Sequence, residues 1–186
     1  MIPAPSTIPL FAIPFIFLRH GETDSNVRRI VAGSLDVPLT ARGREQAQAA
    51  AAALTGSAVT AIYASPLQRA RHTAEAIATA VGLPVALMDD LQERCWGVLE
   101  GQPQGQRVRG TVPEGAETYE AYAMRVLRGL AAIPSEGTPL VVSHSGVYRV
   151  LCRTLGIPET REPVANATPV SFLPPPTPCG GWQITI

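Results

Sequence analysis

Short apolar segments alternate with segments of helical pattern along most of the chain, and this alternation limits the fold more than any other feature. Strands are expected over residues 15–18, 59–64, 84–88, 140–143, 170–173 and 182–186. Helices are expected over residues 40–54, 66–81 and 117–133, and a further apolar helix face follows residue 144. Because strands that alternate with helices form largely parallel sheets covered on both faces, the sequence predicts an α/β three-layer sandwich. Ligands of such sheets bind at the carboxyl ends of the strands.

Two of the expected helices carry recognisable start signals. Thr40 fits the N-cap of the helix over 40–54, because its hydroxyl can accept a hydrogen bond from a free backbone N–H. Ser65 with Pro66 has the pattern of a cap followed by proline at the first helical position. We therefore expect the second helix to begin at Pro66.

The length of 186 residues is typical of one domain, and we expect a single domain over 1–186. The apolar run from Ile8 to Leu18 is similar to a signal-peptide core, but no Lys or Arg precedes it and no small-residue cleavage site follows it. It is also too short to span a bilayer. We therefore expect residues 1–12 to form an N-terminal tail before a buried first strand, and the protein to be cytoplasmic.

The charged residues exclude several mechanisms. The chain carries 15 basic and 15 acidic residues, and every basic residue is an arginine. The absence of lysine excludes the P-loop lysine, the kinase strand lysine and Schiff-base chemistry. Zero net charge without a basic run argues against nucleic acid or an anionic membrane as the main partner. Any anion that a side-chain cation of this protein binds is therefore bound by a guanidinium group.

The three histidines are distributed in a way that indicates a site. His20 directly follows the first expected strand, and His144 directly follows the strand over 140–143, whereas His72 lies within a helix. An isolated histidine is most often a local packing or capping residue. Two histidines at equivalent strand ends, where the ligand site of an α/β protein forms, favour a functional role.

Other chemistries fit the sequence poorly. A zinc site is not indicated, because HExxH and CxxC patterns are absent and the histidines are too few for a three-histidine site. The segment Ser143–Gly146 lacks the G-x-S-x-G pattern of serine hydrolases. Cys152 falls in mid-helix among apolar neighbours, which is unfavourable for a nucleophile. Together with Cys95 and Cys179 it shows no paired spacing, and we interpret all three as free thiols of a reducing compartment.

Four ordered segments resemble the motifs of the histidine phosphatase superfamily, the phosphoglycerate mutase-like proteins. They are Leu18–Thr23 (LRHGET) with Asn26, Ser65–Ala70 (SPLQRA) with Thr73, Leu91–Arg94 (LQER) with Gly97 and Glu100, and Val142–Val147 (VSHSGV) with Arg149. The resemblance extends from about Phe15 to Leu155. A single Arg-His-Gly would be weak evidence, whereas four motifs in order are specific.

The resemblance implies a role for each of five residues. His20 would attack phosphorus and form a phosphohistidine, because a histidine of ordinary pKa is substantially neutral at cytoplasmic pH. Arg19 and Arg69 would clamp the phosphoryl oxygens, which favour planar bidentate donors. His144 would donate a further hydrogen bond to the phosphoryl group. Glu93 would protonate the leaving alkoxide and then activate the attacking water.

Further residues are expected at or near the substrate. Asn26 and Ser145 would supply polar contacts in the same pocket. Gly33 either lets the backbone approach the substrate or forms a plain turn. We interpret three charged residues of the motifs as supports of the architecture: Glu22, Arg94 and Glu100.

Residues 102–116 (QPQGQRVRGTVPEGA), called the cap segment below, are short for a cap of this superfamily and are hydrophilic. We therefore expect an open, lightly covered site that admits water, which favours a phosphatase over a mutase. Arg107 and Arg109 of this segment either reach an anionic substrate or are simply solvated.

Together these features predict a metal-independent phosphomonoesterase that acts on a small phosphorylated metabolite through a phosphohistidine on His20, without a metal or a cofactor. The resemblance implies sugar phosphates, phosphoglycerate or ribazole phosphate as substrates without choosing among them, and it leaves a homodimer open. The alternatives are a cofactor-dependent phosphoglycerate mutase and a non-catalytic phosphate-binding or interaction module. The intact set of five site residues argues against the last, because a decayed site would have lost at least one.

Overall fold

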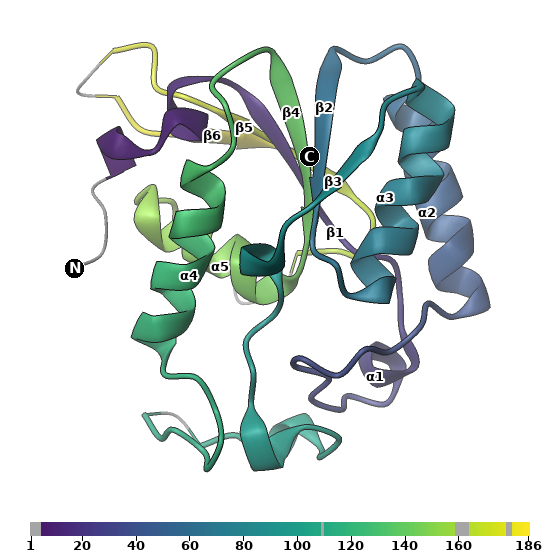
Figure 1. The fold of residues 1–186 in the computed structure, drawn as a ribbon, viewed down its shortest axis with the longest axis vertical. Coiled ribbons are helices and arrows are strands. Elements are labelled where there is room, and N and C mark those ends of the chain that lie inside the picture. Colours follow the sequence, from purple (N-terminus) through teal and green to yellow (C-terminus); the bar gives the residue numbers. More distant parts are fainter. Residues whose placement is uncertain (1–4, 109, 159–163, 178–179) are drawn as a thin grey trace.

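A six-stranded sheet forms the centre of the molecule (Figure 1). The computed structural model describes residues 5–108, 110–158, 164–177 and 180–186. The strands lie in the order β3-β2-β4-β1-β5-β6. Their bounds are Phe15–Arg19 (β1), Val59–Ala64 (β2), Val85–Leu87 (β3), Thr138–Ser143 (β4), Pro169–Leu173 (β5) and Gln183–Thr185 (β6). The pairs β3-β2, β2-β4 and β4-β1 are parallel, whereas β5 and β6 are added antiparallel, so the predicted largely parallel sheet is confirmed.

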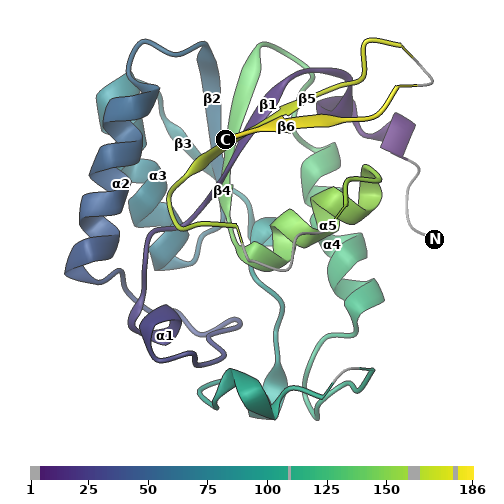
Figure 2. The same ribbon diagram turned by 180° about the vertical axis from the view of Figure 1, so that it is seen from behind.

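Helices cover both faces of this sheet. They are α1 (Asp24–Val27), α2 (Ala41–Leu54), α3 (Gln68–Val81), α4 (Tyr119–Ala131) and α5 (Ser145–Thr154). Figures 1 and 2 show α2 and α3 on one side of the sheet and α4 and α5 on the other, which confirms the three-layer sandwich. Within the described ranges, none of the helices combines the length and apolar character that crossing a bilayer requires.

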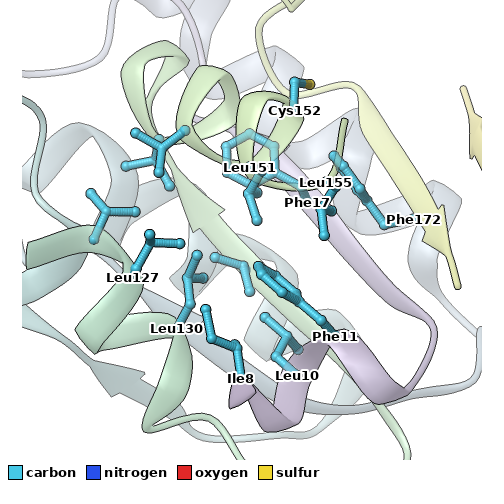
Figure 3. Close-up of a cluster of buried hydrophobic side chains, with 14 of the residues drawn as sticks. Ile8, Leu10, Phe11, Phe17, Leu127, Leu130, Leu151, Cys152, Leu155 and Phe172 are labelled. Atoms are coloured by element: carbon cyan, nitrogen blue, oxygen red, sulfur yellow. The ribbon is translucent and has the colours of Figure 1, made fainter. Parts of the chain in front are cut away.

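Alternate residues of β1 face the two sides of the sheet and join two separate cores. Phe15 and Phe17 belong to the core beneath α4 and α5, which Figure 3 shows with Leu127 and Leu151. Leu18 belongs to the core beneath α2 and α3. Each of these side chains is at most 1 % exposed, and burying one stabilises the fold by about 1.5–3 kcal/mol.

The N-terminal segment differs from the expected tail. Residues 5–12 form two short 3-10 turns, Pro5–Thr7 and Pro9–Ala12, instead of extending freely from the first strand. Ile8, Leu10 and Phe11 are buried in the same core as Phe17 (Figure 3). The described part of the expected tail therefore packs onto the domain, because its apolar side chains gain more from burial than from exposure to water.

The helix starts match one prediction and correct another. Thr40 caps α2 as predicted, since its Oγ1 accepts a hydrogen bond from the backbone N–H of Gly43 at 2.9 Å. The expected start at Pro66 is wrong, because α3 begins at Gln68 and its N-cap residue makes no side-chain cap hydrogen bond. The hydroxyl of Ser65 instead lies 2.8 Å from Nε2 of His144. The Ser65 side chain, which the local pattern assigned to a helix cap, therefore makes a tertiary contact instead.

The register of β1 and β4 brings the two strand-end histidines together. Arg19, the last residue of β1, is paired with Ser143, the last residue of β4. His20 continues this pairing, because its backbone N–H donates to the carbonyl oxygen of Ser143 at 2.9 Å. The ring centres of His20 and His144 are consequently only 5.2 Å apart.

Candidate active site

A cavity of about 400 Å³ lies where β1 and β4 end. Seven of the eight predicted site residues line it: Arg19, His20, Asn26, Gly33, Arg69, Glu93 and Ser145. His144 is not among the lining residues, although its ring neighbours that of His20. The volume is typical of a site for a small metabolite.

His20 is held as a neutral ring with one nitrogen engaged. Its Nδ1 lies 2.7 Å from the carbonyl oxygen of Gly21, which can only accept a hydrogen bond, so Nδ1 carries the proton. Burial, followed by the positive charges of Arg69 and Arg19, lowers the pKa of His20 well below its ordinary value. Nε2 therefore keeps its lone pair at neutral pH.

Two arginines, the buried Arg69 and the half-buried Arg19, line the same cavity as His20. Arg69 is 1 % exposed and donates from Nη1 to the carbonyl oxygen of Leu35 at 2.7 Å and from Nη2 to that of Gly33 at 2.8 Å. Arg19 donates from Nη1 to the carbonyl oxygen of Val164 at 2.8 Å, and its buried Nε has no partner among the described residues. Burial lowers the pKa of both arginines, but an arginine starts so high that both stay charged. The main-chain contacts position these cations, and their remaining N–H groups can meet an anion.

The carboxylate of Glu93 is fixed by three donors. Its Oε1 accepts from the backbone N–H of Arg94 at 2.8 Å and from the Tyr122 hydroxyl at 2.9 Å, and its Oε2 accepts from the backbone N–H of Gly146 at 3.0 Å. Burial, then the neighbouring charge of Glu93, raises the pKa of Tyr122 well above its ordinary value, so the phenol stays a donor. A Cβ at position 146 would collide with Oε1 of Glu93, and only glycine permits this approach.

His144 is completely buried, and only one of its ring nitrogens has a partner. The Ser65 hydroxyl lies 2.8 Å from Nε2, whereas the buried Nδ1 makes no hydrogen bond within the part of the chain that the structure describes. Because the backbone N–H of Leu67 donates to the same hydroxyl, Ser65 can turn its hydrogen to Nε2 and leave the ring proton on Nδ1. An unpaired buried donor in a native fold calls for an explanation, and an acceptor on a ligand would provide one. Direct contact of His144 with a phosphoryl group stays a prediction.

The three expected substrate contacts all line the cavity, but each also has a structural task. Asn26 forms a capping box with Thr23 at the start of α1, with its Oδ1 accepting from the backbone N–H of Thr23 at 3.0 Å. Gly33 lies in a turn with a φ of +54°, and a Cβ there would collide with the carboxylate of Glu100. The turn interpretation of Gly33 is therefore confirmed, whereas its approach to a substrate stays a prediction. Ser145 is the first residue of α5, so it begins the helix at the end that lines the cavity.

The predicted supports do connect neighbouring segments. Arg94 donates from Nε and Nη2 to the carbonyl oxygen of Glu117 at 2.9 and 2.6 Å. The Glu100 carboxylate accepts backbone N–H groups from two loops at 2.7 and 3.0 Å. The Glu22 carboxylate accepts the hydroxyl of the α2 N-cap threonine at 2.9 Å. Arg94 in addition lines the cavity.

The cap segment covers one side of the cavity. Backbone hydrogen bonds tie it to the loop before α2, from Val31 to Gln102 at 2.9 Å and from Gln104 to Arg29 at 2.8 Å. The cavity wall includes two cap residues, Gln104 and Arg107. Arg109 lies outside the described residues.

Several cavity residues were not predicted from the sequence. Tyr119 and Tyr122 are one turn apart on α4, and Arg153 follows Arg149 of the fourth motif by one turn of α5. Helical spacing could have suggested these pairs, because residues three or four apart share a face. Asn166, which contacts the main chain of His20, had no signal in the sequence. Its Nδ2 donates to the carbonyl oxygen of His20 at 2.7 Å.

The chemistry of the wall suits an anion. Arginines outnumber acidic residues on it, and Glu93 is the acidic residue among the described ones that line it. Across the described ranges, no group of three or more histidine, cysteine, aspartate or glutamate residues lies close enough to hold a metal ion. A neutral imidazole, two fixed guanidinium groups and an oriented carboxylate together can bind a phosphoryl group, attack it and transfer a proton.

The two buried histidines make stability depend on pH. Burial, then nearby positive charge, lowers the pKa of both His20 and His144, so below about pH 6.5 the unfolded chain binds protons that the folded chain does not. We expect the free energy of unfolding to fall by about 1.4 kcal/mol per pH unit for each histidine between about pH 6.5 and 5. Urea unfolding of the His144→Asn protein should show a reduced slope, whereas His72→Asn, at an exposed helical position, should keep the slope of the parent. Equal slopes in all three proteins would contradict this assignment.

Comparison with known proteins supports the family. The family model described as the Histidine phosphatase superfamily (branch 1) matches residues 15–171. The chain is 34 % identical over 146 residues to "Uncharacterized phosphatase PhoE" of Bacillus subtilis, covering 75 % of this chain and 76 % of that protein. It is 32 % identical over 159 residues to the adenosylcobalamin/alpha-ribazole phosphatase of Escherichia coli, covering 76 % of this chain and 78 % of that protein. It is also 37 % identical over 164 residues to "Probable phosphoglycerate mutase GpmB" of an Enterobacter species, covering 78 % of this chain and 76 % of that protein.

A solved structure agrees with these relatives. A mycobacterial glucosyl-3-phosphoglycerate phosphatase in complex with VO3 superposes with a TM-score of 0.76 at 26 % identity, covering 94 % of this chain and 98 % of that one. The chain therefore belongs to the histidine phosphatase superfamily, in its branch 1.

Proposed function

We propose that the protein is a metal-independent phosphomonoesterase that hydrolyses a small phosphorylated metabolite through a phosphohistidine on His20. The observation that carries this proposal is the neutral ring of His20, whose Nδ1 is engaged by Gly21 at 2.7 Å and which lines one cavity together with Arg19 and Arg69. A neutral imidazole is a nucleophile, and the two cations attract the group that it attacks.

The first step transfers the phosphoryl group to the enzyme. Nε2 of His20 attacks phosphorus with its lone pair, and the P–O bond to the alcohol breaks. Arg19 and Arg69 hold the non-bridging oxygens, on which negative charge is spread. The leaving oxygen takes a proton from Glu93, which must enter this step in its acid form.

The second step returns the enzyme to its starting state. Water attacks the phosphorus of the phosphohistidine and passes a proton to Glu93, while the P–N bond breaks and its electron pair returns to Nε2. Inorganic phosphate then leaves. Tyr122 and the backbone N–H of Gly146 hold Glu93 in place for both proton transfers, at 2.9 and 3.0 Å.

Hydrolysis is favoured over mutase chemistry by the shortness of the cap segment. A mutase must keep water from the phosphohistidine, whereas a phosphatase must admit it. The cap segment adds only Gln104 and Arg107 to the described cavity wall. The curated relatives include proteins with phosphatase names and proteins with a phosphoglycerate mutase name, and the solved structure carries a phosphatase name.

Turnover of a generic aryl phosphate with a chelator present tests the proposal. We expect phosphate release that the chelator does not reduce. We also expect inhibition by vanadate, which can mimic the trigonal-bipyramidal transition state held by the two arginines. Loss of activity on chelation would contradict metal independence. Absence of turnover, on the aryl phosphate and on a panel of phosphorylated metabolites, would favour a non-catalytic binding module.

A separate assay distinguishes the mutase alternative. The protein is supplied with phosphoglycerate, and the isomerised product and free phosphate are measured in the same reaction. We expect free phosphate to appear first. Faster formation of the isomer, with or without added bisphosphoglycerate, would contradict the phosphatase proposal.

A further inference from the structure

The ring of His144 has one nitrogen bound inside the fold and one without a partner. Nε2 lies 2.8 Å from Oγ of Ser65, whereas the equally buried Nδ1 makes no hydrogen bond to any described residue. Both Ser65 and His144 are completely buried, so bulk solvent does not compete for these groups. The position of the ring proton therefore depends on where the Ser65 hydroxyl places its own hydrogen.

The Ser65 hydroxyl has a single hydrogen and a restricted choice of partners. Among the described residues, its Oγ contacts the backbone N–H of Leu67 at 3.3 Å and Nε2 of His144 at 2.8 Å. The N–H of Leu67 can only donate, so Nε2 is the one of these two partners that can accept the hydroxyl hydrogen. A neutral imidazole has one donor and one acceptor nitrogen, and the ring of His144 then carries its proton on Nδ1.

The opposite tautomer would leave more buried groups without partners. With the proton on Nε2, the hydroxyl hydrogen of Ser65 would lack an acceptor among the described residues, and Nδ1 of His144 would be an unpaired acceptor. With the proton on Nδ1, only the Nδ1–H group is unpaired. Because each unsatisfied buried group lowers stability, Ser65 favours the tautomer protonated on Nδ1.

The tautomer matters because the ring of His144 is neutral. Burial, followed by the neighbouring charges of Arg69, His20 and Arg19, lowers the pKa of His144 well below its ordinary value. A cationic ring would donate from both nitrogens, whereas a neutral ring donates from only one. The ring centres of His144 and His20 are 5.2 Å apart, and Nε2 is already occupied by Ser65. Nδ1 is therefore the nitrogen that is left for a group bound at His20.

We propose that Ser65 is a positioning residue: by donating its hydroxyl hydrogen to Nε2, it keeps the proton of His144 on Nδ1 and makes this nitrogen a donor to the phosphoryl group. The proposal rests on the proposed phosphatase function, with its phosphoryl site at His20. Ser65 acts through His144, since it does not itself line the cavity. The other tautomer would direct a lone pair at phosphoryl oxygens, which only accept hydrogen bonds, and the contact would be lost.

Nuclear magnetic resonance tests the tautomer without any turnover. Long-range proton–nitrogen correlation spectra are recorded on protein with isotope-labelled histidine. The chain has three histidines, so His72→Asn and His20→Asn variants suffice to assign the signals. At neutral pH we expect the parent to show His144 protonated on Nδ1 and not on Nε2. In Ser65→Ala, Nε2 loses its donor, and a substantial part of the population should move to the tautomer protonated on Nε2.

Binding of orthovanadate connects the tautomer to the phosphoryl site. Calorimetry measures its affinity for the parent, for Ser65→Ala, for His144→Ala and for the double variant. Ser65→Ala should weaken binding about 5- to 100-fold, because a donor to an anion is lost from a buried site. If Ser65 acts through His144, the same substitution in the His144→Ala background should change the affinity less than about twofold. Ser57→Ala, at an exposed position before β2, should bind vanadate as the parent does.

The outcomes separate this proposal from the proposed function. Protonation of the parent His144 on Nε2, an unchanged tautomer in Ser65→Ala, absence of vanadate binding by the parent, or equal losses of affinity in both backgrounds would overturn it. A shifted tautomer with a loss confined to the parent background supports it, even if the parent releases no phosphate from any ester. Phosphate release together with an unchanged tautomer in Ser65→Ala would support the phosphatase and refute the role of Ser65.

Discussion

Replacing His20 by alanine is expected to abolish phosphomonoester hydrolysis, with kcat reduced by at least about 10³-fold. The reason is chemical, because the variant has no nitrogen to accept the phosphoryl group and water must then attack the ester directly. Phosphate release from an aryl phosphate measures the loss. His72→Ala, an exposed histidine on α3, is the matched control and should retain the activity of the parent.

Two further measurements make this result specific to the nucleophile. Rapid quenching of the parent protein in alkali should trap a phosphohistidine, which the His20→Ala protein should not form. His20→Asn retains a polar side chain that can donate to the carbonyl oxygen of Gly21, and it should be folded by circular dichroism but inactive. Substantial activity in either variant, with a phosphoenzyme still formed, would move the nucleophile to another residue.

Replacing Glu93 by glutamine is expected to slow hydrolysis by about 10²- to 10⁴-fold when the leaving group is an alkoxide. An alkoxide is a poor leaving group that needs a proton, and the amide cannot supply one. An aryl oxide leaves without full protonation, so the loss for an aryl phosphate should be at least tenfold smaller. The comparison is made from kcat on glycerol phosphate and on an aryl phosphate.

The dependence on the leaving group distinguishes proton transfer from a general disturbance of the site. The two oxygens of Glu93 together accept from three donors, and glutamine replaces one of these oxygens by an NH₂ group that cannot accept. Some loss with both substrates is therefore expected. Glu45→Gln, at an exposed position of α2, controls for the change of charge. Equal losses on both substrates would assign Glu93 a purely structural or electrostatic role.

Local patterns located the strands and most helices because they depend on residues close in sequence. Val59–Ala64 and Thr40 are recovered as a strand and an N-cap from periodicity and capping chemistry alone. Residues 1–12 were harder, because prolines and the lack of a regular period left no element to predict. The burial of Ile8, Leu10 and Phe11 follows from a surface offered by α4 and β1, which no local pattern describes.

The candidate site divides in the same way. Arg19 ends a strand and His20 follows it in a recognisable motif, so their place at the carboxyl end of a parallel strand could be predicted. Ser65 shows the limit, since its local pattern is that of a helix cap but its hydroxyl contacts His144. The unpaired Nδ1 of His144 likewise appears only once the packing around it is known.

By itself, the sequence determined the α/β class, the strand-end position of His20 and the use of guanidinium groups as the cations, because these depend on periodicity, motifs and the absence of lysine. The tertiary structure alone decided what orients the reactive groups. Tyr122 lies 29 residues from Glu93, and Asn166 lies 146 residues from His20, yet each donates a hydrogen bond to that partner. Such contacts are set by the packing of distant elements, and no spacing in the sequence encodes them.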